Sequence, residues 1–365
     1  MNAPSSNALE ERIIALIAAQ GPISVAQYMT LALHDAKGGY YATRQPFGAA
    51  GDFMTAPEIS QMFGEMLGLW CVQVWHDQGH PRHKRLVELG PGRGTMMADA
   101  LRAAKVAPEF LLGLDVVLVE SSPALQKAQA EKLKDSGAAI RWAPHFDDSM
   151  ADRPLFLLAN EFFDAMPVRQ YVKTERGWCE RMVVTKNGAL DFALAPTPTP
   201  HAAIAASRAG APDGGIYESA PASTALAEAI ARIVAEKGGG ALLLDYGYGE
   251  NPGDYGETLQ AVGGHRFANV LADPGENDLS AHVDFAAIAG AARHGGAAVY
   301  GPRAQGEFLA DLGITGRAEQ LMKTNPAAAQ NLFSAVERLI GPDQMGNLFK
   351  AMALLPPSAA KPPGF

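Results

Sequence analysis

From residue 85 onward, short apolar runs alternate with segments of helical periodicity, and this alternation constrains the fold more than any other feature. The runs are RLVEL (85–89), DVVLVE (115–120), IRWA (140–143) and LFLLAN (155–160). The helical segments between the first three are TMMADALRAA and SPALQKAQAEKLKD. Strands that alternate with helices of this length form a parallel sheet covered by helices on both faces, with right-handed crossovers. The sequence therefore predicts an α/β fold.

The segments outside this core indicate how the chain is organised. Helical spacing occurs over residues 8–20, after Ser24 and from Pro57 onward, whereas residues 168–192 alternate with turn signals and predict a β-hairpin or small meander. We expect N-terminal helices and an active-site loop over 1–80, a core over 81–355 with an insertion at about 168–235, and a loose tail over 356–365. Within the core we expect a loop over 246–282 and helices near 283–294, 304–312 and 326–340.

Composition narrows the classes of function. A formal net charge of −9 disfavours coating nucleic acid, because phosphate binding relies on clustered Lys and Arg. The two cysteines have no ligand-like spacing, so neither a metal site nor a disulfide framework is predicted, and a reducing compartment fits. The sequence contains no apolar window of the length that predicts a membrane span, and its N-terminal residues lack the pattern of a targeting segment. We expect a bacterial-type cytoplasm.

Three glycines, Gly90, Gly92 and Gly94, stand between the first expected strand and its helix. Such a turn can adopt positive φ, and a ligand can approach its main chain beside the free N–H groups of a helix N-terminus. A dinucleotide-binding fingerprint needs its third glycine at position 95, which is Thr95, and a P-loop needs Lys followed by Ser or Thr. The G-x-G-x-G spacing instead favours S-adenosylmethionine.

Two acidic residues accompany the glycine turn. Glu120 ends the second expected strand, where its carboxylate can accept hydrogen bonds from a ribose diol. Glu88 lies in the strand before the glycines, and we place it near the amino group of the cofactor's methionine part. The alternatives are a solvated strand end for Glu120 and a structural ion pair for Glu88.

A second polar cluster follows the fourth expected strand. Asn160, Glu161 and Asp164 come directly after PLFLLA, and the end of this strand adjoins that of the first in an open α/β sheet. Two carboxylates and an amide suit a cationic substrate such as a guanidinium, which a carboxylate holds bidentately. The alternative is helix capping by Asn160, with Asp164 in the first turn.

Three further segments carry candidate polar residues. GDFMTAPEIS (51–60) supplies Gly51, Asp52, Thr55 and Glu58 from a loop that can close over a cofactor. The alternative is an ordinary connection between two helices, capped by Thr55. LLLDYG brings Asp245 to the end of another strand. We rank His282, in DLSAHVDF, low as a base.

Five strings together resemble one known family. GDFMTAPEISQMFGEMLG, VELGPGRGT, ANEFFDAMPVRQY, LLLDYG and DLSAHVDF occur in the order and spacing of the MidA-type protein arginine methyltransferases, and the resemblance covers about residues 10–355. The family includes a mitochondrial member that assists assembly of respiratory complex I.

The resemblance has consequences for fold, cofactor and substrate. It implies a seven-stranded, Rossmann-like methyltransferase sheet with an N-terminal helical segment and inserted excursions. It implies S-adenosylmethionine as methyl donor and, as acceptor, a protein arginine on the 49 kDa-type subunit of complex I, with the mitochondrial matrix as the compartment of eukaryotic relatives. The cofactor residues map onto Gly90, Gly92, Gly94 and Glu120, with the Gly51–Asp52 loop nearby. Glu161 or Asp164 is similar to the carboxylate of the substrate pocket, and no paired-Glu loop is evident.

Three other functions stay open at this level. A nicotinamide-dependent oxidoreductase would need the missing glycine at position 95. A methyltransferase of a small molecule or of another protein atom would keep the fold and change the acceptor. A non-catalytic assembly factor would bind S-adenosylmethionine without turnover.

Overall fold

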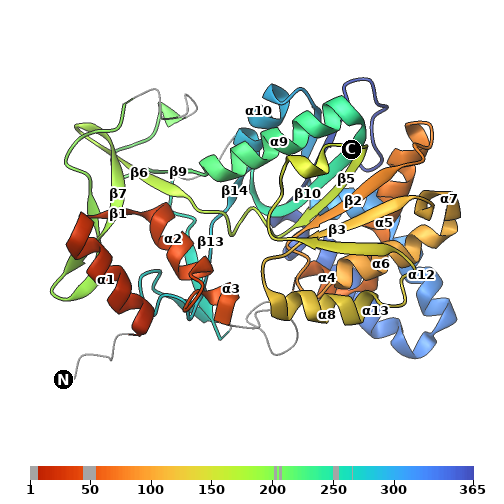
Figure 1. Ribbon diagram of the computed structural model, residues 1–365, viewed down its shortest axis with the longest axis horizontal. Helices are drawn as coiled ribbons and strands as arrows, with labels where there is room; N and C mark the ends of the chain where they lie inside the picture. Colours follow the sequence, from red (N-terminus) through yellow and green to blue (C-terminus); the bar gives the residue numbers. More distant parts are fainter. Residues whose placement is uncertain (1–6, 44–54, 201–203, 205–207, 250–254, 265) are drawn as a thin grey trace. The chain divides into compact units, whose positions relative to one another are not determined.

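The computed structural model describes residues 7–43, 55–200, 204, 208–249, 255–264 and 266–365. The chain divides into two compact units, and each draws on three separate stretches of sequence. The first unit comprises residues 1–53, 164–223 and 250–282, and the second comprises 54–163, 224–249 and 283–365. Figure 1 shows the elements of both units.

The second unit contains a mixed sheet that confirms the expected methyltransferase architecture. Its order is β15-β16-β10-β5-β2-β3-β4, and a short eighth strand, β14, pairs with β10. The strands β2 to β5 and β10 are parallel, whereas β16 runs antiparallel to both β10 and β15. The strands are β2 (Lys84–Leu89), β3 (Leu114–Val119), β4 (Ala139–Ala143), β5 (Leu155–Asn160), β10 (Gly239–Tyr248), β14 (Val283–Asp284), β15 (Ala298–Ala304) and β16 (Phe349–Leu355).

The central strands are buried on both faces, which explains the nearly continuous apolar runs of β3, β5 and β10. All six residues of β2 are buried, and successive side chains point to opposite faces of the sheet. Leu86 packs into the core on one face, and Val87 packs into the core on the other. The first face is covered by α5 (Gln61–Asp77), α6 (Thr95–Ala103), α8 (Pro123–Leu133), α11 (Gln305–Asp311), α12 (Ile314–Thr324) and α13 (Ala329–Ile340). The second is covered by α9 (Pro221–Lys237) and α10 (Phe285–His294) (Figure 1).

The helix expected from Pro57 is interrupted. The structure has α4 (Ala56–Ile59), then an extended Ser60, then α5. The Ser60 hydroxyl accepts a hydrogen bond from the Met62 N–H at 3.2 Å and caps the second helix. Farther along α5, a Cβ at Gly68 would lie 2.5 Å from the carbonyl oxygen of Ala100 in α6. The absence of a side chain therefore allows the close approach of these two helices.

The first unit combines helices with two antiparallel sheets. The expected meander over 168–192 is confirmed by β6, β7 and β8, to which β1 and β9 add, whereas the expected loop over 246–282 contains a small three-stranded sheet. The Glu218 carboxylate holds that segment, because it accepts hydrogen bonds from the N–H groups of Thr258 and Leu259. The elements are α1 (Ala8–Gln20), β1 (Ile23–Ser24), α2 (Val25–His34), α3 (Tyr40–Thr43), β6 (Arg169–Thr174), β7 (Gly177–Lys186), β8 (Ala189–Leu194), β9 (Ile216–Ser219), β11 (Gln260–Gly263), β12 (Arg266–Ala268) and β13 (Asp278–Ser280).

Two further differences concern the C-terminal part of the second unit. Helix α12 was not expected, because residues 314–324 include Gly316 and end at Thr324-Asn325-Pro326. The last ten residues are packed rather than loose. The Phe365 ring lies 5.1 Å from that of Phe308, and Arg303 donates to the Gly364 carbonyl at 2.7 Å. Short helices α7 (Pro108–Leu111) and α14 (Met345–Leu348) complete the unit. None of the helices over the described ranges is long and apolar enough to cross a membrane.

Candidate functional site

The glycine turn joins β2 to α6 at the carboxyl edge of the sheet. Gly90, Gly92 and Gly94 have φ values of 60°, 52° and 78°, which confirms the expected left-handed backbone. A Cβ at Gly90 would lie only 2.9 Å from Cδ2 of Phe162. The turn therefore needs glycine for both its conformation and its packing, and it leads directly into the N-terminus of α6.

Glu88 lies beneath this turn, on the face of β2 that α6 covers. Its side chain is buried, and burial raises the pKa of its carboxyl to about 8, although a hydrogen bond from the Met97 main chain opposes this. Its Oε2 has no hydrogen-bond partner among the described residues. A structural ion pair, the alternative for Glu88, is not found over the same residues.

Glu120 directly follows β3, one strand away from the turn. The Ser122 N–H donates to its Oε1 at 2.7 Å, and the side chain of Gln129 donates to its Oε2 at 3.3 Å. Burial raises the pKa of the Glu120 carboxyl. The carboxylate is thus held in place at the edge where we expected it.

Sequence reasoning missed Gln129, which lies on α8. Its amide also donates to the Gly92 carbonyl oxygen at 2.7 Å, so it contacts the glycine turn as well as Glu120. The sequence did contain a signal, because Leu125, Gln129 and Leu133 recur at the spacing of one helix face. A polar residue within such a stripe indicates a specific buried contact.

Asn160 and Glu161 lie together at the end of β5, which pairs in parallel with β2. The Asn160 amide nitrogen donates to Glu161 Oε1 at 3.0 Å, and the Ala56 N–H donates to the same oxygen at 3.2 Å. The Asn160 Oδ1 atom is buried and has no hydrogen-bond partner within the described part of the chain. Helix capping does not apply, because residues 161–168 form no helix.

The backbone at Glu161 is unusual and is held from the next strand. Its φ of 49° is rare for a residue with a side chain, and such strain concentrates at functional sites. Asp245 of β10 supports the segment, since its Oδ2 accepts the N–H groups of Phe162 and Phe163 at 3.1 and 2.9 Å. Asp245 therefore contributes to the site through the main chain.

Helix α4 connects this cluster to the glycine turn. The Glu58 carboxylate accepts a hydrogen bond from the Thr95 hydroxyl at 2.6 Å and lies 3.6 Å from the Arg93 guanidinium. Thr55 is the N-cap of α4, but its side chain makes no capping hydrogen bond. Gly51 and Asp52, which we expected beside the cofactor, lie outside the described residues.

The remaining candidates belong to the first unit. The Asp164 carbonyl oxygen accepts a hydrogen bond from the Ala281 N–H at 2.9 Å, and the adjacent His282 N–H donates to the Thr258 hydroxyl at 2.8 Å. Burial lowers the pKa of His282, so its imidazole favours the neutral form. The structure therefore brings Asn160 and Glu161 together and places Asp164 in a separate compact unit.

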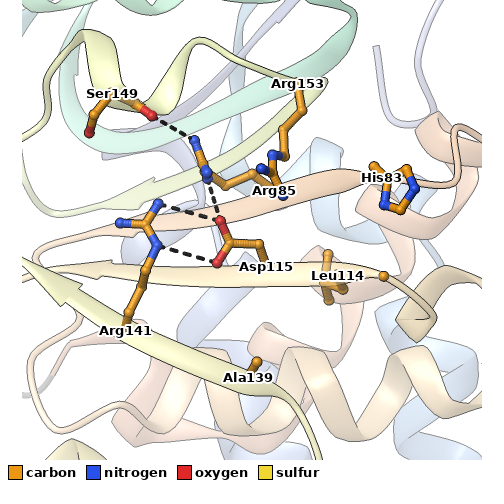
Figure 2. A pocket seen from close by; sticks show the side chains of 9 residues that line it. His83, Arg85, Leu114, Asp115, Ala139, Arg141, Ser149 and Arg153 are labelled. Atoms are coloured by element: carbon orange, nitrogen blue, oxygen red, sulfur yellow. Dashed lines mark hydrogen bonds and ion pairs between the residues drawn. The ribbon is translucent and has the colours of Figure 1, made fainter.

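A depression of about 680 Å³ lies at the opposite edge of the sheet, where β2, β3 and β4 begin (Figure 2). Asp115 lies between two arginines there, 2.7 Å from Arg85 and 3.3 Å from Arg141. Because ligands of open α/β sheets bind at the carboxyl edge, we assign this depression no part in the site. The described residues contain no group of His, Cys, Asp and Glu side chains able to hold a metal ion.

Comparison with known sequences decides the family. Residues 66–303 match a family of S-adenosyl-L-methionine-dependent methyltransferases. The chain belongs to this family. It is therefore an S-adenosylmethionine-dependent methyltransferase, and the resemblance drawn from the five strings is confirmed.

Named relatives and solved structures cover nearly the whole methyltransferase. The chain is 35% identical to protein arginine methyltransferase NDUFAF7, mitochondrial, of Danio rerio, over 96% of this chain and 88% of that one. It is 36% identical to the Homo sapiens protein of that name, over 93% and 81%. The crystal structure of a COG1565 superfamily member from Burkholderia thailandensis, bound to S-adenosyl-homocysteine, is 30% identical with a TM-score of 0.86, over 100% and 97% of the two chains.

The residues of this methyltransferase fit its cofactor. The left-handed glycines of the turn lead into the N-terminus of α6, whose free main-chain N–H groups can face a ligand. Glu88 offers a buried carboxyl oxygen beneath the turn, and Glu120 offers a carboxylate one strand away. The turn has no P-loop lysine to neutralise a chain of phosphates. A nucleoside linked to an amino acid suits this set of groups better than a diphosphate.

Proposed function

We propose that this chain is a protein arginine N-methyltransferase. The observation that carries the proposal is the Asn160–Glu161 pair, which presents a carboxylate and a buried amide oxygen at the carboxyl end of β5. Relatives over most of the chain are named protein arginine methyltransferases, which supports the same acceptor.

The cofactor side of the site uses the first three strands. We assign the main chain of Gly90, Gly92 and Gly94 to contact with the cofactor, Glu120 to its ribose hydroxyls, and Glu88 to its amino group. A protonated amine and a buried carboxyl stabilise each other's charged forms. Thr55, at the N-cap of α4, remains a proposed contributor, as do Gly51 and Asp52, which precede it in the sequence.

The acceptor side uses the end of β5. The Glu161 carboxylate suits a guanidinium, because planar N–H donors match its oxygens, and Asn160 Oδ1 can accept a further N–H. The hydrogen bond from Asn160 to Glu161 fixes the amide, because a carboxylate oxygen only accepts and the nitrogen must face it. Asp164 remains the second proposed carboxylate of the acceptor site.

When bound, S-adenosylmethionine supplies an electrophilic methyl group on a positively charged sulfur. The contribution of this chain is mainly alignment, since two oxygens that hold the guanidinium fix the direction of its reacting nitrogen. The field of the Glu161 carboxylate favours a cationic acceptor, and the ionised carboxylate can take up the proton that the nitrogen loses.

The proposal extends to the identity of the acceptor protein and to the cellular compartment. We propose an arginine of the 49 kDa-type subunit of respiratory complex I, with a role in assembly of that complex. The relatives are named mitochondrial. For this chain we propose a bacterial-type cytoplasm, which is consistent with its two buried, free cysteines.

The test combines methyl transfer with mass spectrometry. The full chain is incubated with S-adenosylmethionine and the purified 49 kDa-type subunit, and peptides are searched for methyl-arginine. Asn160→Ala and Glu161→Gln should retain the affinity for S-adenosyl-homocysteine within about threefold and lose at least about tenfold in transfer. Gln73→Ala on an exposed turn of α5 is the control and should act normally.

Each other outcome points to a different function. Transfer to a different atom or molecule would reject the arginine acceptor. Cofactor binding without transfer to any acceptor in a lysate would favour an assembly factor. Normal turnover by both the Asn160 and the Glu161 variants would reject the acceptor site.

A further inference from the structure

We infer that Gln129 is a positioning residue that holds the Glu120 carboxylate and the glycine turn at a fixed separation for the ribose of the cofactor. The inference rests on the proposed role of Glu120. Gln129 is 0% exposed, yet it lies on the apolar face of α8. A leucine or methionine would fill such a position without any polar group to satisfy.

The hydrogen bonds of Gln129 determine how its amide is turned. The indole nitrogen of Trp142 lies 2.7 Å from Gln129 Oε1, and an indole N–H can only donate. The amide oxygen therefore faces Trp142, and the NH₂ group faces the site. Its two N–H donors reach the Gly92 carbonyl oxygen at 2.7 Å and Glu120 Oε2 at 3.3 Å.

These two acceptors come from different βα units. Gly92 belongs to the turn after β2, and Glu120 follows β3. One NH₂ group thus spans the two parts of the cofactor site, while Trp142 of β4 holds it from behind. The stem of Gln129 also lies close to the turn, since a Cβ at Gly94 would be 3.3 Å from Gln129 Cγ.

The contact leaves Glu120 able to bind a ligand. A carboxylate has about four lone-pair directions, and the donors from the described residues are the main chains of Ser121 and Ser122 and the Gln129 amide. The remaining lone-pair capacity is available to a diol. Without Gln129, the carboxylate keeps main-chain donors from Ser121 and Ser122 but loses its link to the glycine turn. The free-energy cost of ordering the carboxylate on binding would then reduce the affinity for the ribose.

The experiment measures binding to the full chain by calorimetry. We expect Gln129→Met to weaken S-adenosyl-homocysteine binding about tenfold or more, in line with loss of hydrogen bonds to a charged group. Competition by adenosine and 2′,3′-dideoxyadenosine supplies the specific readout, because the preference for adenosine should fall with Gln129→Met. A purely structural defect would weaken both nucleosides equally.

The matched control is Gln126→Met on the same helix. Gln126 donates to the main-chain carbonyl of Glu120 at 2.8 Å and does not contact its carboxylate, so binding should stay within about threefold. In a double-mutant cycle with Glu120→Gln, the two losses should be less than additive, because Gln129 acts through Glu120.

The outcomes separate this inference from the proposed site. Normal binding by the Glu120 variant would overturn the ribose assignment itself. If the Glu120 variant binds weakly, the ribose assignment stands. The positioning role alone would then be overturned if Gln129→Met bound normally or kept its preference for adenosine. If Gln129→Met does not fold, Trp142→Phe removes only the donor behind the amide, and the same loss of preference is expected; an unchanged preference would overturn the inference.

Discussion

The ring of Phe162 fills the space beside Gly90 in which a side chain would begin, so the main chain of the glycine turn and the segment after β5 are packed against each other. The two proposed halves of the site, for cofactor and acceptor, are therefore coupled by direct contact within the second unit. A substitution in one half of the site is therefore expected to alter binding in the other half.

Gly90→Ala tests this contact. The new Cβ would meet Phe162 at 2.9 Å in a backbone with φ of 60°, so S-adenosyl-homocysteine binding should fall at least about tenfold. Gly79→Ala is the control, because Gly79 also has positive φ but has nothing within 4 Å of the position that a Cβ would take. Equal effects of the two variants on binding would show that the contact with Phe162 has no importance.

Glu88→Gln tests the buried carboxyl through pH. The unfolded carboxyl loses its proton near 4.5, whereas burial raises the folded pKa to about 8. Between these values the folded state binds more protons, so wild-type stability should fall as pH rises, by up to about 1.4 kcal/mol per unit relative to Glu88→Gln. Urea unfolding from pH 4 to 9 measures the difference, which should level off outside this window. Parallel curves would contradict the buried, protonated state.

Asp245→Asn tests the support of the acceptor segment. The carboxylate accepts N–H groups from Phe162, Phe163 and Tyr246, whereas an amide has only one accepting oxygen. The variant should lose about 1–3 kcal/mol of stability and transfer methyl groups more slowly. Denaturant unfolding and the transfer assay check this. Unchanged stability would mean that these N–H groups find other acceptors.

A pair of glycine substitutions tests the close packing of α5 against α6. Gly68→Ala would place a Cβ 2.5 Å from the Ala100 carbonyl oxygen, and we expect a loss of about 1–3 kcal/mol from overpacking. Gly290→Ala lies in α10 with nothing within 4 Å, so it should stabilise the protein by about 0.5–1 kcal/mol through helix propensity. Thermal unfolding measures both changes in stability. Stabilisation of both variants would contradict the packing argument.

The parts of the fold that sequence predicts best are those in which local pattern and burial agree. In residues 84–89 the apolar Leu86, Val87 and Leu89 face both sides of the core, and the run ends at the glycine turn, so strand, turn and helix could all be expected. The three-stranded sheet within 255–282 could not, because its strands are short and depend on contacts such as those of Glu218. The grouping of the chain into two compact units likewise depends on distant contacts that no local pattern reveals.

The candidate site was predictable to a similar extent. Acidic or amide side chains at strand ends, such as Glu120 and Asn160, follow from the parallel sheet. Gln129 was missed because its amide acts from within a helix, where periodicity says only that the position is buried. The Ser60 break was missed because a single extended residue barely disturbs the apolar period.

The pairing of β10 with β5 places Leu244 opposite Asn160, with Asp245 following on β10. Successive strand residues face opposite ways, so displacing β10 by one step would turn Asp245 away from the amides that it now restrains. The position of Asp245 at the edge of the sheet therefore depends on the register of β10 with β5 in the core. Evolution of a new acceptor preference would have to conserve that alignment while altering the groups beyond it.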